Sequence, residues 1–293
     1  MLSIGIIAGL IAMVCWGVAD YYQALIVRKL GSIKYMFFSS LMTFVITLPL
    51  IIPFLAKGLI LFNTKTIIIL VIAGIIDIFA AYNFMRSMEI GEIAIVTPIS
   101  AAYALVTVFL AFIFLGERLT FLQSLAIFVI LIGIFLVSTD LKKLRHIHTT
   151  KGVKEALITT LLWGVFFLML GLAKKQLIEY DKLAIAITLF FFTSIINSFL
   201  MASFAFLRKG TASLPDMKDN FLQVFIIFVL YTIAWAAYNY GFVSGMVSIV
   251  APVSSLYPAI TVIMAVVLLK EKLLMNQKIG AVFLLAGIFL LSF

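Results

Sequence analysis

Two carboxylates stand within long apolar stretches of this sequence. Asp77 lies in "GIIDIFAAYNF", and Asp20 follows Trp16 by four residues in "CWGVADYY". A spacing of four places Trp16 and Asp20 on one face of a helix. An indole ring beside a carboxylate makes a surface suited to a cationic or amphipathic guest. These two acids are therefore the first candidates for binding chemistry.

The composition places both acids inside a membrane. Of the 293 residues, 65% are hydrophobic and 11% are charged, and the mean hydropathy is +1.26. Successive apolar stretches have the roughly 20 residues that a helix needs to cross a bilayer, whereas barrel strands would alternate over about ten. The sequence predicts an all-α polytopic protein of the plasma (inner) membrane. Ten transmembrane helices are expected near 3–27, 35–56, 66–88, 92–115, 121–139, 155–173, 183–207, 219–242, 246–269 and 276–292.

An acid in the middle of a membrane helix needs a partner or a cavity, because it costs roughly 2.5–3.5 kcal/mol on insertion scales. Arg86 cannot pair with Asp77 along the helix, since it stands about two and a half turns away. A basic group on another helix remains an alternative partner for Asp77, and Arg28 or Lys29 is one for Asp20. Otherwise both acids face a substrate cavity, and they are the candidates for proton coupling, with Asp77 favoured.

Motifs of the first half of the chain return in the same order in the second half. The matched pairs are "WGV" at 16–18 and 163–165, "AAYN" at 80–83 and 236–239, "IVTP" at 95–98 with "IVAP" at 249–252, and "GIFL" at 133–136 and 287–290. Tryptophan, Tyr-Asn, proline and glycine are hard to obtain in one order by chance. Each unit holds five expected spans, and an odd number inverts the second unit relative to the first.

The sequence therefore predicts two inverted five-helix repeats, residues 1–141 and 155–293, joined by a basic linker at 142–154. Two histidines in this linker, His146 and His148, have no further ligands nearby and are expected to be solvated rather than metal-bound. Inverted repeats are the construction of many secondary transporters, which hold substrate near the midplane and rock one repeat against the other. A passive scaffold built by gene duplication is the alternative.

The matched helices carry further side chains that could line a common cavity. Packing between helices is the alternative for the aromatic residues, and helix-to-helix hydrogen bonds are the alternative for the hydroxyls. Neither acid has a counterpart in the second half, where Phe167 and Ile233 stand, so the fold alone does not explain them. The predicted substrate-binding set is Trp16, Asp20, Asp77, Tyr82, Asn83, Ser100, Tyr103, Trp163, Trp235, Tyr238, Asn239, Ser254 and Tyr257.

Proline and glutamate recur at matched places outside this set. Pro98 and Pro252 stand near the starts of the fourth and ninth expected helices, where each bends the helix and forms either a simple kink or part of a gate. Glu117 and Glu271 follow these helices at loop mouths. They are better explained as charges favourable to a helix start than as part of the substrate site.

Two five-helix units, each with Trp-Gly in the first helix, proline in the fourth and Glu in the turn "FLGERLT" or "LLKEKLL", resemble EamA-type proteins of the drug/metabolite transporter superfamily. The second turn departs from the pattern by having Lys270 in place of glycine. The resemblance covers nearly the whole chain. It implies a ten-helix carrier of small metabolites, usually amino acids or amines. It also implies a central cavity lined mainly by helices one, three, four, six, eight and nine.

Several other functions lack their sequence signals. The chain has no zinc-protease motif, no nucleophile elbow and no Walker A sequence, so an enzyme or an ATP-driven pump is not expected. Unmatched acids in two repeats do not supply the rings of like residues that a channel needs. The predicted function is secondary transport of a small organic metabolite. The alternative is an uncoupled exchanger or facilitator of a cationic solute.

The expected partners are a small-molecule substrate, the lipid bilayer and protons, for a monomer or a homodimer without cofactor or metal. Nucleic acid is not expected despite the net charge of +9, because the 21 Lys and Arg residues lie mainly in the connections between spans. With each basic residue assigned to its nearest connection, 15 of the 21 fall in odd-numbered connections. This places both termini outside. The family resemblance implies the opposite orientation.

Overall fold

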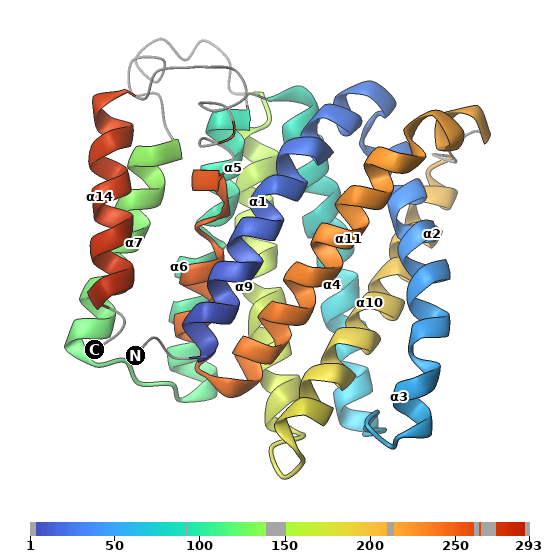
Figure 1. Ribbon diagram of the computed structural model, residues 1–293, viewed down its shortest axis with the longest axis horizontal. Helices are drawn as coiled ribbons and strands as arrows, with labels where there is room; N and C mark the ends of the chain where they lie inside the picture. Colours follow the sequence, from blue (N-terminus) through green and yellow to red (C-terminus); the bar gives the residue numbers. More distant parts are fainter. Residues whose placement is uncertain are drawn as a thin grey trace.

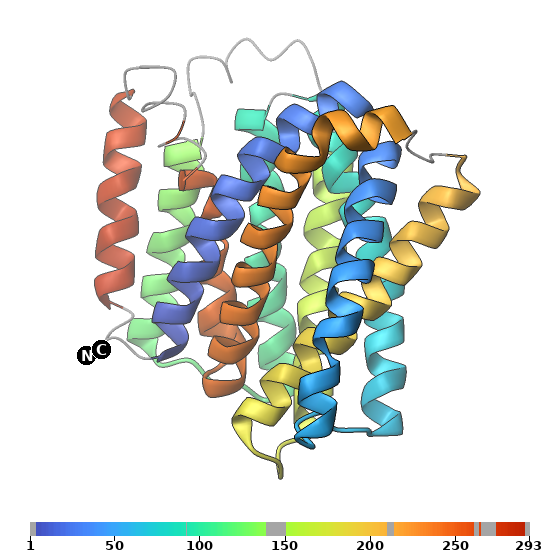
Figure 2. The same cartoon turned by 45° about the vertical axis from the view of Figure 1, so that its right-hand side comes forward.

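The chain folds into a bundle of helices that run across the molecule in alternating directions (Figure 1; Figure 2). The computed structural model describes residues 4–91, 93–138, 151–209, 214–260, 264 and 274–290, and these ranges contain helices and no strand. The helices are α1 Ile4–Leu30, α2 Ser32–Leu50, α3 Ile52–Ala56, α4 Thr64–Ile90, α5 Ile93–Ala101, α6 Tyr103–Leu110, the π-helix η1 Ala111–Leu115, α7 Phe121–Ser138, α9 Val153–Lys175, α10 Lys182–Leu207, α11 Leu214–Ser244, α12 Val247–Ser254 and α14 Met275–Leu290.

Seven helical stretches in the described ranges are long and apolar enough to cross a membrane. They comprise α1, α2 with α3, α4, the stretch Val96–Leu115, α9, α10 and the part of α11 from Lys218. Two shorter apolar stretches, Phe121–Leu136 and Val247–Ile260, lie beside them. The expected all-α membrane protein is therefore confirmed at the level of its helices. Long apolar side chains such as Phe109 and Phe128 lie exposed on the outside, as a bilayer requires.

Helices from the two halves of the chain pack against one another in pairs. The pairs are α1 with α11, α4 with α9, α2 with α10, and α7 with α14. The last pair forms one edge of the bundle and the α2–α10 pair the opposite edge (Figure 1). This interleaving buries a core of aromatic and aliphatic residues contributed by both halves.

The fourth and ninth expected helices are each interrupted shortly after the proline that was expected to bend them. Ala102 separates α5 from α6, and Ser255 and Leu256 follow α12 before the helical residues 257–260. Each break comes three to four residues after its proline, Pro98 in α5 and Pro252 in α12. Proline cannot donate to the preceding turn. The chain then tightens into i→i+3 bonds, Leu105 N to Ala102 O at 3.0 Å and Ala259 N to Leu256 O at 2.9 Å.

Polar side chains at the helix ends satisfy backbone groups that the helices leave unpaired. Asn63 accepts from Thr66 N at the start of α4, and Asp181 accepts from Leu183 N at the start of α10. At the C-terminal end of α4, Arg28 donates to the carbonyls of Met88 (3.2 Å) and Gly91 (3.0 Å). A cation there is favourable to the helix dipole.

Lys174 repeats this arrangement in the second half. Its ammonium donates to the carbonyls of Phe242 (2.8 Å) and Gly245 (2.9 Å) at the end of α11, and lies 5.0 Å from the Phe242 ring centre. Glu117 caps the start of a helix, as expected, but this helix is α12 and not the one that follows Glu117 in the chain. Its carboxylate accepts from Val247 N (3.0 Å) and Ser248 N (2.9 Å), which caps α12 in the other half. Glu271 lies outside the described residues.

Candidate binding cavity

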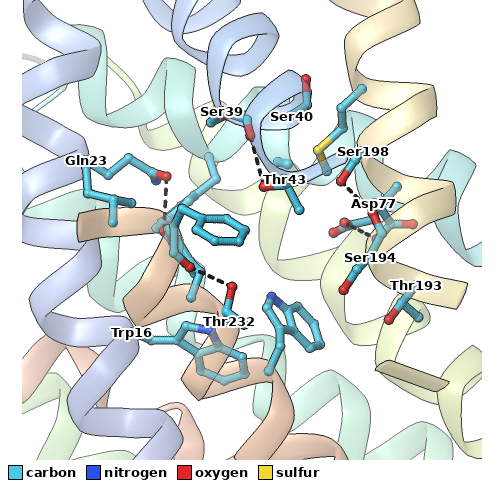
Figure 3. Close-up of a pocket in the computed structure, with 18 of the residues that line it drawn as sticks. Trp16, Gln23, Ser39, Ser40, Thr43, Asp77, Thr193, Ser194, Ser198 and Thr232 are labelled. Atoms are coloured by element: carbon cyan, nitrogen blue, oxygen red, sulfur yellow. Dashed lines mark hydrogen bonds between the residues drawn. The ribbon is translucent and has the colours of Figure 1, made fainter. Parts of the chain in front are cut away.

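A cavity of about 210 Å³ lies among the helices of both halves. Its walls come from α1, α2, α4, α9, α10 and α11, with Tyr103 from the start of α6 and Tyr257 after the break that follows α12. Figure 3 shows Asp77 with Ser194 and Ser198 on one side, and Trp16 with Gln23 on the other. The two helix breaks thus place a tyrosine each at the cavity.

Asp77 lies near the middle of α4 and is only 6% exposed. Its two carboxylate oxygens accept separate hydrogen bonds from the second half of the chain, from Trp163 Nε1 of α9 at 2.9 Å and from Asn197 Nδ2 of α10 at 2.8 Å. Gly74 permits this approach, because a Cβ there would stand 2.8 Å from Asn197 Oδ1. A carboxylate of the first half is therefore held by donors of the second.

Asp20, 5% exposed, has a different kind of partner. It is hydrogen-bonded to the hydroxyl of Tyr231 on α11, which also lies 3.1 Å from Gln23 Oε1. Within the described part of the chain, no basic side chain forms an ion pair with Asp20 or Asp77. The alternative pairing of Asp20 with Arg28 or Lys29 is wrong, because Arg28 caps α4 and Lys29 donates to Asn220 at 2.9 Å.

Aromatic rings line the cavity around these acids. Trp16 meets Trp235 edge to face with ring centres 5.3 Å apart, and Tyr103 lies 5.8 Å from Trp163. Trp16, Trp163 and Trp235 all stand at the cavity wall. Their negative faces and the two carboxylates give the cavity a chemistry suited to an organic cation. Among described residues, no three His, Cys, Asp or Glu side chains gather as a metal site would need.

The structure brings only part of the predicted set to the cavity. The predicted residues at its wall are Trp16, Asp20, Asp77, Tyr103, Trp163, Trp235 and Tyr257. Tyr238 is fully buried behind the wall, 5.5 Å from the Trp16 ring, and Tyr82 packs on Phe204. The remaining predicted residues, Asn83, Ser100, Asn239 and Ser254, are absent from the lining.

Local hydrogen bonds explain where several of these residues point. Asn83 Nδ2 donates to Phe79 O and Asn239 Nδ2 donates to Trp235 O, so each amide turns back onto its own helix. Ser254 lies 3.4 Å from the Tyr103 hydroxyl and bonds Ala251 O, in a buried contact between α12 and α6. None of these residues is part of the cavity lining, and a direct role for them in binding stays a prediction.

Comparison with known proteins identifies the family. The profile of the EamA-like transporter family matches residues 3–139 and again 150–293. The chain belongs to this family. It is an integral membrane protein, and the resemblance indicated by its Trp-Gly, proline and Glu motifs is confirmed.

Individual relatives agree with the EamA-like assignment. The chain is 27% identical over 152 residues to the uncharacterized transporter YojE of Bacillus subtilis, covering 51% of the chain and 50% of YojE. It is 45% identical over 64 residues to the uncharacterized protein MJ1333.1 of Methanocaldococcus jannaschii, covering 22% of the chain and 47% of that protein. The chain thus spans about half the length of these curated relatives. A solved structure described as "Crystal structure of protein" matches the fold, with a TM-score of 0.72 at 15% identity over 100% of this chain and 98% of that one.

The EamA resemblance alone missed two walls of the cavity. The second and seventh helices were not among the main lining helices that it implied, yet α2 and α10 supply most of the polar side chains. These are Ser39, Ser40, Thr43 and Thr47 on α2, and Thr193, Ser194, Asn197 and Ser198 on α10. A signal was present in the sequence, because three of the α2 residues recur at a spacing of four and mark one helix face.

Proposed function

We propose that this chain is a secondary carrier that moves a small organic solute bearing a cationic group across the membrane by alternating access. The observation that carries the proposal is a cavity between the two halves with two buried carboxylates that form no ion pair within the described residues. Buried carboxylates without a cation are costly in a bilayer, and such groups mark substrate or ion paths. A cationic solute would supply the missing charge.

The aromatic rings and hydroxyl groups of the cavity wall further restrict the chemical class of the proposed solute. Three tryptophans at the wall favour an apolar or aromatic body beside the cation, and the hydroxyls of α2 and α10 offer hydrogen bonds to polar substituents. The cavity volume of about 210 Å³ suits a metabolite the size of an amine or amino acid rather than a peptide. An amphipathic amine fits this combination best.

Alternating access requires two units that can exchange roles. The packing of the helices supports two inverted repeats with ten spans in total as these units. In such a repeat α1 corresponds to α9, α4 to α11 and α5 to α12. Exchanging counterparts turns the α1–α11 contact into the α9–α4 contact and the α5–α9 contact into the α12–α1 contact, and all four contacts occur. The α2–α10 and α7–α14 pairs map onto themselves. α1 begins and α14 ends at the same face of the bundle, which suits an even number of crossings (Figure 1).

The close contacts made by glycines are also related by exchange of the two halves. A Cβ at Gly17 would meet Ile260 and one at Gly164 would meet Val106, and these two partners are 154 residues apart. Gly133 approaches Leu284, whereas Gly287 approaches Ile130, again an exchange at 154 residues. Such reciprocal approaches are expected of duplicated units related by a pseudo-twofold axis.

Ligand binding to the purified chain tests the substrate class. Thermal unfolding in detergent is measured with primary amines, amino acids and nucleosides, because a ligand that binds the folded state raises the apparent melting temperature. Amines with an aromatic or aliphatic body are expected to stabilise the chain most. Stabilisation by anionic or neutral solutes alone would overturn the cationic class. Hits are then tested for counterflow in proteoliposomes.

The uncoupled exchanger is the second candidate, since two acids could simply hold a cationic solute without carrying a proton. A pH gradient distinguishes the two. A coupled carrier accumulates the amine against its concentration when a gradient is imposed, whereas an exchanger performs counterflow and ignores the gradient.

A further inference from the structure

The two buried acids differ in the kind of donor that faces them. Both donors to Asp77 are nitrogen groups, Trp163 Nε1–H at 2.9 Å and Asn197 Nδ2–H at 2.8 Å. An indole nitrogen can only donate, and an ionised carboxylate can only accept. Two such bonds, one to each oxygen, satisfy Asp77 as an anion and stabilise its charge.

Asp20 stands in a network that is short of one proton. The Tyr231 hydroxyl lies within hydrogen-bond distance of Asp20 Oδ1 and of Gln23 Oε1 at 3.1 Å, yet a hydroxyl carries a single hydrogen. If Asp20 is ionised, one of these two acceptors is left without that hydrogen. If Asp20 is protonated, its O–H donates to Tyr231, whose own O–H donates to Gln23, and all three groups are satisfied.

We infer that the two carboxylates divide the work of coupled transport, with Asp20 carrying the exchanged proton and Asp77 remaining ionised as the anchor for the cation of the solute. The inference rests on the proposed carrier function and extends it. It differs from the sequence prediction, which favoured Asp77 for the proton.

The surroundings of Asp20 suit a proton that comes and goes. Among the residues that the structure describes, the titratable groups that interact with its carboxyl are the tyrosines Tyr35 of α2, Tyr103 of α6, Tyr231 of α11 and Tyr257, which follows α12. They are neutral hydroxyls, so none supplies a fixed positive charge that would hold Asp20 ionised. Gln23, which shares Tyr231 with Asp20, lies across the cavity from Asp77 (Figure 3).

The unpaired acceptor beside Asp77 supports its role as the cation anchor. Asn197 Oδ1 is buried without a hydrogen-bond partner, although Asn197 Nδ2 is bonded to the carboxylate. An ammonium carries three N–H donors. It can bond the Asp77 carboxylate and Asn197 Oδ1 together while its body rests on the Trp163 and Phe84 rings, which lie 4.7 Å apart.

Exchange then proceeds with charge and protons in balance. When Asp20 releases its proton to water on one side, Tyr231 donates to the new carboxylate and Gln23 loses that bond. The cavity then holds two anions and binds the cationic solute at Asp77. On the other side, protonation of Asp20 removes one of the two attracting charges, and the cation leaves. No bond other than that of the transferred proton forms or breaks.

Infrared spectroscopy of the full chain in detergent, without any solute, locates the proton directly. Exposed carboxyls are ionised at neutral pH, so the carbonyl stretch of a carboxylic acid reports a buried protonated acid. We expect this band in the wild type and in Asp77→Asn, and its loss in Asp20→Asn. A band lost in Asp77→Asn but kept in Asp20→Asn, or no band in the wild type, would overturn the inference.

A second pair of variants covers the case in which Asp20→Asn does not fold. Tyr231→Phe removes the hydroxyl beside Asp20, and Trp163→Phe removes a donor to Asp77. The band should shift in frequency in Tyr231→Phe and stay in place in Trp163→Phe. The reverse pattern would assign the proton to Asp77 and end the proposal.

Transport of phenethylammonium in proteoliposomes tests the consequence. Asp20→Asn should keep measurable counterflow and lose accumulation driven by a pH gradient, whereas Asp77→Asn should lose both. Gradient-driven accumulation by Asp20→Asn would contradict the inference. If the wild type neither binds nor moves the probe, the proposed substrate class fails, and the infrared result still decides where the proton resides.

Discussion

At the scale of single residues, the cavity is organised by which half of the chain supplies each group. Asp77 belongs to the first half, and its two donors, Trp163 and Asn197, belong to the second. Asp20 is likewise bonded across the halves by Tyr231. A relative movement of the two halves would therefore change the hydrogen bonds of both acids, and in the proposed carrier this would couple binding at the acids to the conformation.

Asp77→Asn is expected to weaken binding of phenethylammonium by tenfold or more, about 1.4 kcal/mol, because the cation loses the carboxylate that anchors it. The fold should persist, since the new amide oxygen can still accept from Trp163, and the Asn197 amide can turn so that its Oδ1 accepts from the new amide nitrogen. Binding is measured by calorimetry and folding by thermal unfolding.

Glu179→Gln provides the matched control, since it makes the same charge change at an exposed acid. It should bind the probe as the wild type does. Equal weakening in both variants would mean that net charge, rather than a contact with Asp77, governs affinity.

At the scale of elements, helix starts and breaks hold the cavity in place. α12 is short, ends at a break after Pro252, and has its first N–H groups capped by Glu117 from the loop before α7. The loop of one half therefore fixes a helix of the other. Tyr257, at the cavity wall, follows directly after this capped helix and its break.

Glu117→Ala should lower the free energy of unfolding by about 1–3 kcal/mol, because buried N–H groups of α12 lose a charged acceptor. The melting temperature in detergent measures the loss. Glu179→Ala removes an exposed acid with the same side chain and should leave the melting temperature nearly unchanged. If both variants behave alike, the cap contributes nothing to stability.

At the scale of the whole molecule, contacts made by one half are repeated by the other with the roles exchanged. Gly17 and Gly164 are the second residues of the matched "WGV" motifs. Gly17 leaves room for the residues that follow the break after Pro252, and Gly164 leaves room for those that follow the break after Pro98. A Cβ would stand 2.5 Å from Ile260 Cβ at Gly17 and 2.3 Å from Val106 Cγ1 at Gly164. Small residues are used in membrane helices for such close approach.

Gly17→Ala and Gly164→Ala are therefore expected to destabilise the chain to a similar extent, by about 1–3 kcal/mol of overpacking. This loss should exceed the gain of about 1 kcal/mol that alanine brings to a helix. Gly245→Ala is the control, because its Cβ would come no nearer than 3.4 Å to another atom. Thermal unfolding checks all three, and tolerance of only one of the matched pair would count against a symmetric architecture.

Membrane sidedness is a further property of the whole chain. Tags fused to both ends should react with an impermeant reagent from the same side, because α1 begins and α14 ends at one face of the bundle (Figure 1). Labelling from outside the cell would support the orientation predicted from the Lys and Arg count, with both termini outside. Labelling only after permeabilisation would support the orientation that the family resemblance implies, with both termini inside. Tags on opposite sides would exclude an even number of crossings.

Much of the architecture followed from the sequence because its signals are local or repeated. The length of each apolar stretch indicates a membrane-spanning helix. Motifs such as Trp-Gly and "AAYN" recur in both halves and reveal the repeat without reference to any contact. The three tryptophans and both acids were selected as cavity residues because a charge or a large ring inside an apolar helix needs a special environment. All five of these side chains stand at the cavity wall.

The partners of these residues were decided only by the tertiary structure. Asn197 lies 120 residues from Asp77, and Tyr231 lies 211 residues from Asp20, so no helical period connects them. Asn83 and Asn239 looked equally suitable as site residues, but each found a backbone carbonyl one turn away and faces its own helix. A helical spacing determines which face a side chain occupies, whereas the packing of distant helices determines whether that face meets lipid, protein or a cavity.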